Sequence, residues 1–137
     1  MPTTEQTVTD LYEAWRNGRL DVVLERLDEG IEHTIHIPPS VNPIGGSVHG
    51  RAATAERLAA IGRDYEILAF DNGEIVADGD EARTQVRLRY RHRQSGEVIE
   101  TVSEHHWRLA NGRVVAFEEF HDVEAVRAFS RRCGFCD

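Results

Sequence analysis

Apolar residues in the first part of the chain recur every three or four positions, which is the spacing of one helix face. Asn17-Gly18 ends the first such stripe, and glycine is the residue that most often follows a last helical turn. A second stripe follows within residues 20–27, so two short helices are predicted to pack together as a helical hairpin. The first stripe comprises Val8, Leu11, Tyr12 and Trp15, and the second Leu20, Val23, Leu24 and Leu27.

After Gly30 the apolar spacing changes to strict alternation, which predicts a strand over residues 31–37. One face of this strand carries Ile31, His33, Ile35 and Ile37, and the other carries Glu32, Thr34 and His36. A long loop rich in proline and glycine occupies residues 38–50, and loops of this length commonly form lids or pocket walls. Helical spacing then returns over residues 51–63.

From Tyr65 onward the pattern is that of an antiparallel meander followed by one helix. Strands are predicted over residues 65–78, 82–93, 97–110 and 113–120, with short turns between them, and Asp122 is placed to cap the final helix. Helices first, then one strand, a helix, a meander and a helix indicate an α+β fold. We expect one domain over residues 1–130 and a short tail over residues 131–137.

Asn111-Gly112 predicts a two-residue hairpin, because this turn needs positive φ at both central residues. A regular hairpin about this turn places Val102 opposite His121, Glu104 opposite Glu119 and His106 opposite Phe117. One sheet face then brings two carboxylates and two imidazoles together among apolar side chains. The other face would expose an apolar surface, which predicts a homodimer through Trp107, Leu109, Val114, Ala116 and Phe120.

Composition limits the function classes. A chain of 137 residues with 40% hydrophobic and 29% charged residues is typical of a globular domain. Its net charge of −8 argues against nucleic acid or an anionic membrane as the partner. No apolar run approaches the ~20 residues that span a membrane, and no signal peptide opens the chain, so a cytoplasmic protein is expected. The only cysteines, Cys133 and Cys136, are interpreted as a reduced pair in a loosely held tail.

The order and lengths of these elements resemble the nuclear transport factor 2-like (NTF2-like) superfamily, specifically its SnoaL-like and ketosteroid-isomerase-like branch. Three stretches carry the resemblance: NGRLDVVLERL at residues 17–27, the helix start at Gly50-Arg51, and NGRVVAFEEFHDVEAV at residues 111–126. The resemblance implies a strongly bent, mostly antiparallel sheet that wraps the N-terminal helices into a cone around an apolar pocket. It also implies a dimer through the outer face of the sheet.

The resemblance also bears on individual residues. It places Glu104 where ketosteroid isomerases keep a protonated aspartic acid, and Phe117, Glu119 and His121 at pocket-lining positions. The isomerase's oxyanion tyrosine corresponds to Leu11, and its general base falls near Ile35 or His36, so a faithful steroid isomerase is not expected.

A two-residue Ser95-Gly96 turn would put the arginine row (Arg87, Arg89, Arg91) on the Glu104 face. The resemblance instead puts Val86, Leu88 and Tyr90 there, which requires a bulge, and this second arrangement is preferred.

These observations favour a small-ligand pocket protein with cofactor-free general acid–base chemistry: an isomerase, cyclase, dehydratase or epoxide hydrolase. Glu104 is the expected acid or oxyanion donor, Glu119 and His121 share the base role, and His36 is a weaker candidate base. At least one of the two glutamates should have a raised pKa if they share a dry site, whereas as halves of surface ion pairs they would not. The expected ligand contacts are Leu11, Trp15, Tyr90, Val102, His106 and Phe117.

Two alternatives remain open. His36, His106 and His121 could ligate a metal together with a carboxylate, although imidazoles doing acid–base work without metal are favoured. The second alternative is a non-catalytic ligand-binding or dimeric interaction module on the same fold.

Overall fold

The computed structural model describes residues 2–137, which form four helices and seven strands. The order along the chain is α1 (Thr4–Arg16), α2 (Leu20–Glu25), β1 (Leu27–His36), β2 (Gly46–His49), α3 (Arg51–Asp64), β3 (Tyr65–Asn72), β4 (Val76–Asp78), β5 (Glu81–His92), β6 (Val98–Ala110), β7 (Arg113–Phe120) and α4 (Val123–Cys133).

Helices α1 and α4 begin where local side chains satisfy free backbone N–H groups of the first turn. Thr3 and Gln6 form a reciprocal capping box at the start of α1, and the Asp122 carboxylate accepts from the backbone N–H of Ala125 at the start of α4. Gly134, in the left-handed conformation, ends α4, so this helix extends three residues into the segment predicted as a tail. None of the helices in residues 2–137 is long and apolar enough to cross a membrane.

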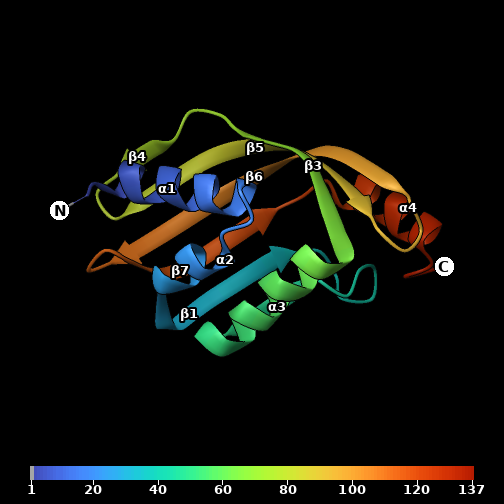
Figure 1. Cartoon of the computed structure of the whole chain (residues 1–137), viewed down its shortest axis with the longest axis horizontal. Helices are drawn as coiled ribbons and strands as arrows, with labels where there is room; N and C mark the ends of the chain where they lie inside the picture. Colours follow the sequence, from blue (N-terminus) through green and yellow to red (C-terminus); the bar gives the residue numbers. More distant parts are fainter. Residues whose placement is uncertain (1) are drawn as a thin grey trace.

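The strands form one mixed sheet in the order β2-β1-β7-β6-β5-β3, with β4 pairing with β5. Only the β1–β7 pair is parallel, so strands from opposite ends of the chain are neighbours. The sheet curls without closing, α1, α2 and α3 lie against its concave face, and α4 lies at one end (Figure 1). The predicted α+β fold with a bent, mostly antiparallel sheet around N-terminal helices is confirmed.

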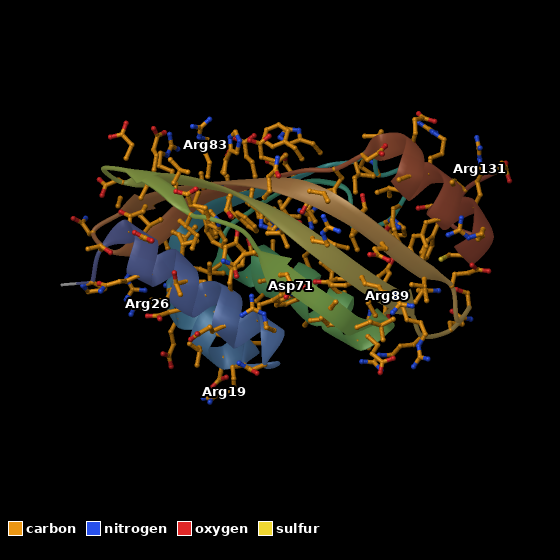
Figure 2. The ribbon with its side chains drawn as sticks, turned by 90° about the horizontal axis from the view of Figure 1, so that it is seen from above. Arg19, Arg26, Asp71, Arg83, Arg89 and Arg131 are labelled. Carbon is orange, nitrogen blue, oxygen red and sulfur yellow. The ribbon has the colours of Figure 1, made fainter. Side chains whose placement is uncertain are left out.

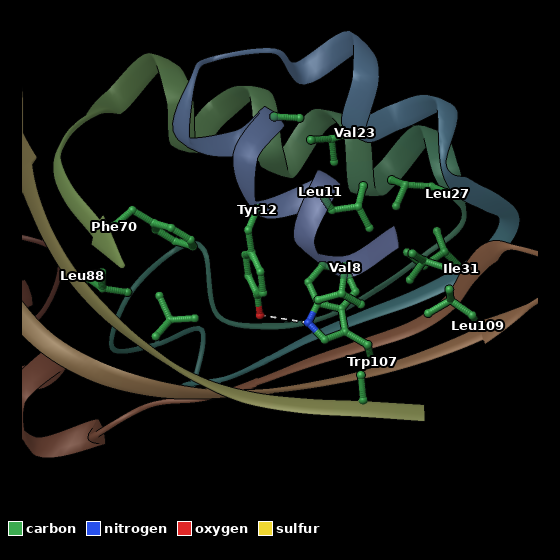
Figure 3. Close-up of a cluster of buried hydrophobic side chains, with 14 residues drawn as sticks. Val8, Leu11, Tyr12, Val23, Leu27, Ile31, Phe70, Leu88, Trp107 and Leu109 are labelled. Atoms are coloured by element: carbon green, nitrogen blue, oxygen red, sulfur yellow. Dashed lines mark hydrogen bonds between the residues drawn. The ribbon is translucent and has the colours of Figure 1, made fainter. Parts of the chain in front are cut away.

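The interior contains two apolar clusters along the concave face. The first lies under α1 and α2, where Val8, Leu11 and Tyr12 pack against strand residues such as Trp107 and Leu109 (Figure 3). The second gathers Ile35, Ile37, Val41, Ile61, Tyr65, Val126 and Phe129. Trp15 and Tyr90 pack against both clusters and therefore lie at their junction.

The β6–β7 hairpin departs from the regular pairing that its turn predicts. Asn111 and Gly112 have φ values of 53° and 75°, as a two-residue turn requires, and Leu109 pairs with Val114. Arg108, however, pairs with Ala116, so Val115 is an extra residue in β7. Every pair beyond this bulge is shifted by one position. The predicted pairing of Glu104 with Glu119 is therefore wrong, and His105 faces Glu119 instead.

The bulge changes which face of β6 lines the interior. Ser103, His105, Trp107 and Leu109 are buried, whereas Glu104 is exposed on the convex face. The predicted dimer surface is wrong in composition, because Trp107, Leu109 and Val114 belong to the core.

The register between β5 and β6 resolves the earlier conflict over the arginine row. Val86, Leu88 and Tyr90 do face the interior, as the resemblance implies, but they meet Ser103, Thr101 and Ile99 there. The arginines of β5 share the convex face with Glu104, so no bulge is needed between β5 and β6. Arg83, a further arginine of β5, projects from the side of the sheet opposite α1, α2 and α3 (Figure 2).

Candidate functional site

A cavity lies between the concave face of the sheet and the helices. It contains about 1100 Å³ of empty space, counting the part open to solvent at its mouth. Its wall is mainly apolar and unusually aromatic: both tryptophans, all three tyrosines and three of the five phenylalanines of the chain line it. Asn42 and Ile44 bring the loop after β1 into this wall, as predicted for a pocket-edge segment.

The polar centre of the cavity is the carboxylate of Glu119 on β7. His33 of β1 places its Nε2 2.7 Å from Oε2 of Glu119, and His121 places its Nε2 3.2 Å from Oε1. The parallel pairing of β1 with β7 sets Ile35 beside Glu119, so His33 reaches the carboxylate from two residues earlier on the same face. The His33 side chain is fully buried and that of Glu119 is 15% exposed.

Hydrogen bonds determine the charge of this carboxylate. Burial raises the pKa of Glu119, but the hydrogen bonds from His121 and His33 outweigh burial and hold that pKa well below its usual range. Glu119 is therefore ionised. The expectation that Glu104 or Glu119 has a raised pKa depended on their sharing one site, and the two lie on opposite faces of the sheet. An ionised carboxylate only accepts hydrogen bonds, so Nε2 of His33 must carry a hydrogen.

A second chain of hydrogen bonds holds His105 beside Glu119. The indole N–H of Trp107 donates to the hydroxyl of Tyr12 over 2.9 Å (Figure 3), and this hydroxyl lies 2.8 Å from Nδ1 of His105. Because Tyr12 oxygen accepts from Trp107, its own hydrogen is available for Nδ1, which leaves the ring hydrogen on Nε2. Nε2 lies 2.9 Å from the hydroxyl of Ser103 and 3.8 Å from Oε1 of Glu119. Burial lowers the pKa of His105 to about 4, so this ring is neutral near pH 7.

His33 retains one atom without a partner. Its Nε2 is engaged by Glu119, but its buried Nδ1 has no hydrogen-bond partner. The ring is stacked on Phe117, with centroids 5.1 Å apart and an interplanar angle of 7°, which restricts its rotation. An unpaired buried acceptor costs about 1–3 kcal/mol, so a ligand group or water is expected to meet it.

Arg57 fixes the backbone that carries His33. Its guanidinium is buried and donates to the carbonyl oxygens of His33 and Gly45, each over 3.2 Å. A side chain on Gly45 would collide with the backbone of Ile37, since an added Cβ would lie 2.1 Å from that residue's carbonyl oxygen. The close approach of this glycine lets Arg57 tie the loop after β1 to the strand that bears His33.

The structure separates the predicted site residues onto two faces of the sheet. Glu119 and His121 lie in the cavity, together with the predicted ligand contacts Leu11, Trp15, Tyr90 and Phe117. Glu104 and His36, predicted as catalytic groups, lie on the convex face, and so do the predicted ligand contacts Val102 and His106. There His36 bonds to Glu118 over 2.7 Å, and His106 lies 3.4 Å from Glu104.

Sequence reasoning did not select His33 and His105. The signal for His33 was present, because alternation placed it on the same strand face as Ile31, Ile35 and Ile37. His105 could not be selected, because the extra residue Val115 reverses the face that a regular hairpin predicts for it.

The proposed metal ligands His36, His106 and His121 are also divided between the two faces. Across residues 2–137 no three or more histidine, cysteine, aspartate and glutamate side chains are grouped so that they could hold a metal ion. In the cavity, His33 and His121 instead form hydrogen bonds with the carboxylate of Glu119, and Nε2 of His105 lies 3.8 Å from it. This arrangement is suited to moving protons.

The curled sheet, the helices on its concave face and the deep apolar cavity define an NTF2-like protein. The model of the SnoaL-like domain matches residues 8–117, and the chain belongs to this family, within the NTF2-like superfamily. No curated protein matches the chain in sequence.

Solved structures show the same fold. An NTF2-like protein of unknown function from Burkholderia pseudomallei K96243 is 25% identical, with 94% of this chain and 98% of that chain covered and a TM-score of 0.81. TerC, solved with polyporic acid, is 16% identical over 93% of this chain and 98% of its own, with a TM-score of 0.81. A provisionally assigned polyketide cyclase from Pseudomonas putida KT2440 is 16% identical over 94% and 98%, with a TM-score of 0.76.

Proposed function

We propose that this small-ligand pocket protein is a cofactor-free enzyme that moves a proton at carbon beside the carbonyl group of a planar, largely apolar ligand. The observation that carries the proposal is the unpartnered Nδ1 of His33, whose opposite ring nitrogen bonds to the ionised Glu119. This pairing is the arrangement in which a carboxylate orients an imidazole and stabilises the cation formed when the ring takes a proton.

In this reaction His33 Nδ1 takes a proton from the carbon, and the electron pair of the broken C–H bond moves into an enolate. In a β,γ-unsaturated ketone the enolate extends to a dienolate, and return of the proton from His33 to its far carbon gives isomerisation. Attack of the enolate on a second carbonyl carbon within the ligand gives cyclisation, and the alkoxide that forms takes the proton back from His33. His121 follows β7 at the edge of the cavity and bonds to the other oxygen of Glu119, so it helps to orient the carboxylate.

The wall of the cavity supports the choice of ligand. Tyr12, Trp15, Phe70 and Phe117 present ring faces and edges that suit a planar conjugated molecule. The relatives point the same way, because one is a provisionally assigned polyketide cyclase and TerC was solved with polyporic acid. The carbonyl requirement comes from the chemistry of the base, since only an acidified C–H bond yields its proton to an imidazole.

The test is exchange of hydrogen for deuterium in the methyl group of 2-acetylnaphthalene in D₂O, followed by proton NMR. The wild-type protein should accelerate this exchange, and Glu119→Gln should lower the rate by about 10²- to 10⁴-fold. Glu118→Gln is the matched control, because Glu118 bonds to a histidine over the same 2.7 Å on the convex face. A wild-type protein that binds the ketone without accelerating exchange would contradict the catalytic proposal.

A non-catalytic binding module is the second candidate function. It is favoured by the strongly lowered pKa of Glu119, whose hydrogen bonds from His121 and His33 make this carboxylate a weak base in its own right. Under that function the same ketone would bind, and Glu119→Gln would change its affinity rather than an exchange rate.

The homodimer is also a proposal, now with a revised surface. Phe120 and Val102 are 37% and 43% exposed on the convex face, where His36 stacks on Phe120 with centroids 4.3 Å apart. Glutamates of β6 and β7 and arginines of β5 share this face, so a two-fold axis could set opposite charges against each other. Sedimentation should show a dimer that Phe120→Lys dissociates, and a wild-type monomer at micromolar concentration would contradict the proposal.

A further inference from the structure

The hydroxyl of Tyr90 is a hydrogen-bond donor that the protein leaves unused. The indole Nε1 of Trp15, on α1, lies 2.8 Å from this oxygen on β5. An indole nitrogen only donates, so the Tyr90 oxygen is the acceptor and its own hydrogen is not consumed by this bond. None of the hydrogen bonds formed within residues 2–137 provides an acceptor for that hydrogen. A largely buried hydroxyl normally finds a partner, so one is expected in the cavity.

The position of Tyr90 in the cavity wall is fixed by its neighbours. Tyr90 lines the cavity, and with Trp15 it packs against both apolar clusters, so it lies at their junction. Tyr65 and Phe70 flank its ring, with centroids 6.2 and 6.5 Å away, which limits its movement. The indole of Trp15 fixes the position of the oxygen.

The other two tyrosines are less suited to this role. The hydroxyl hydrogen of Tyr12 is directed to Nδ1 of His105. The hydroxyl hydrogen of Tyr65 is likewise not consumed by a bond within residues 2–137, but only a long contact of 3.4 Å from Asn42 fixes its oxygen, and Tyr65 packs within the second cluster alone. Burial raises the pKa of Tyr90, the bond from Trp15 opposes this, and the charge of Glu119 raises it further.

We propose that Tyr90 is the specificity-determining residue of the cavity, and that its hydroxyl binds a neutral oxygen acceptor of the ligand, with Trp15 as its positioning residue. The inference rests on the proposed function and adds the interaction that determines the ligand specificity of the cavity. The class it selects is neutral ketones and related carbonyl compounds. A carboxylate ligand would enter a cavity that already holds the ionised Glu119, and a hydrocarbon would leave the Tyr90 donor unpaired.

The hydrogen bond involves no transfer of atoms. The hydrogen stays on the Tyr90 oxygen, because the buried phenol resists ionisation, and the carbonyl oxygen of the ligand accepts it. The bond therefore adds affinity for the carbonyl group itself and does not depend on whether a proton is later removed from carbon.

A ligand pair that differs in one atom group tests this proposal. In 2-isopropenylnaphthalene a CH₂ group replaces the carbonyl oxygen of 2-acetylnaphthalene with little change of shape. Binding of both probes to the wild type, Tyr90→Phe and Tyr65→Phe is measured by tryptophan fluorescence. The ratio of ketone affinity to alkene affinity should fall by about tenfold in Tyr90→Phe and stay unchanged in Tyr65→Phe. Retained binding of the alkene shows that the cavity of the variant is intact.

The carbonyl stretching frequency of the bound ketone gives a second readout that loss of packing alone would not move. A hydrogen bond lowers this frequency, so the wild-type complex should show a lower value than Tyr90→Phe, with Trp15→Phe between them. An unchanged affinity ratio in Tyr90→Phe, a loss confined to Tyr65→Phe, or no binding of the ketone to the wild type would overturn the proposal. If the wild type fails to accelerate methyl exchange but the ketone-to-alkene affinity ratio still falls in Tyr90→Phe, the proposed catalysis is overturned and the role of Tyr90 stands.

Discussion

The two faces of the β1–β7 strand pair carry the same chemical pair, a histidine with a glutamate, in different surroundings. On the concave face Nε2 of His33 lies 2.7 Å from Glu119, and on the convex face Nε2 of His36 lies 2.7 Å from Glu118. The His33 side chain is fully buried, whereas the side chains of His36 and Glu118 are 41% and 46% exposed. The equal hydrogen-bond distances therefore do not imply that the two pairs stabilise the folded protein equally.

Water accounts for the difference between the two pairs. A solvated pair exchanges one set of hydrogen bonds for another and gains little, typically below ~1 kcal/mol. In the mainly apolar cavity each partner depends on the other, and the loss of one leaves an unsatisfied buried group. Burial, rather than the presence of glutamate and histidine, identifies the candidate site.

Replacing the two glutamates should give the largest contrast. Glu119→Ala removes the acceptor of His33 and His121 and should lower the free energy of unfolding by about 4 kcal/mol. Glu118→Ala should lower it by less than ~1 kcal/mol, because water replaces the lost partner. Urea denaturation at pH 7 measures both values, and similar losses would show that the concave pair is as solvated as the convex one.

The pH dependence of stability should sharpen the same contrast. His105 has a pKa of about 4 in the folded protein, against 6.5 for an ordinary histidine. Between these values the unfolded chain binds a proton that the folded protein excludes, so stability falls by up to about 3 kcal/mol as the pH decreases from 6.5 to 4. The contribution of Glu119, whose folded pKa is lowered, is fully present above the ordinary carboxyl pKa of 4.5 and is lost progressively as the pH falls below that value.

Urea denaturation across this pH range provides the measurement. His105→Gln should flatten the dependence between pH 6.5 and 4, whereas His36→Gln on the convex face should leave it unchanged. An unchanged slope in His105→Gln would mean that a different group excludes the proton.

A smaller effect is expected where the hairpin passes into α4. The Asp122 carboxylate accepts from the N–H of Ala125, directly after His121. Asp122→Ala should cost about 1 kcal/mol in unfolding free energy, as for other N-terminal caps. Because the cap orients the segment that holds His121, methyl exchange of 2-acetylnaphthalene should also slow, whereas Glu124→Ala on the same turn should leave it unaffected.

The smallest effect should come from the convex pair by itself. A double-mutant cycle of His36→Gln and Glu118→Gln should give a coupling energy below ~1 kcal/mol that decreases further in high salt. The equivalent cycle of His33→Gln and Glu119→Gln should give a larger and salt-insensitive value. Equal coupling on the two faces would remove the distinction on which the site assignment depends.

The sequence alone predicted the architecture and two of the four polar residues of the candidate site, Glu119 and His121. The helical stripes, the alternation in residues 31–37 and the Asn111-Gly112 turn identify the elements, because each reflects local spacing. Glu119 and His121 were placed in the pocket through their resemblance to family positions. Glu104 was misplaced because a single extra residue, Val115, is accommodated by the curvature of the whole sheet, and no local pattern signals it.

The histidines illustrate the same limit. His33 was recognisable from its isoleucine neighbours, since strand alternation is local. The pairing of His33 with Glu119 was not, because it depends on β1 lying parallel to β7 across 86 positions of the chain. Long-range pairing of this kind follows from the packing of the complete sheet.

The parallel pairing of β1 with β7 also constrains how the protein is made. The two halves of the His33–Glu119 pair leave the ribosome 86 residues apart, which at ~5–20 residues per second is a delay of roughly 4–17 s. During this interval the edge of β1 that will receive β7 has no permanent partner, and unpaired edges of this kind invite association between chains. Nascent-chain protection by chaperones should therefore matter most for this protein after β1 has emerged and before β7 has been synthesised.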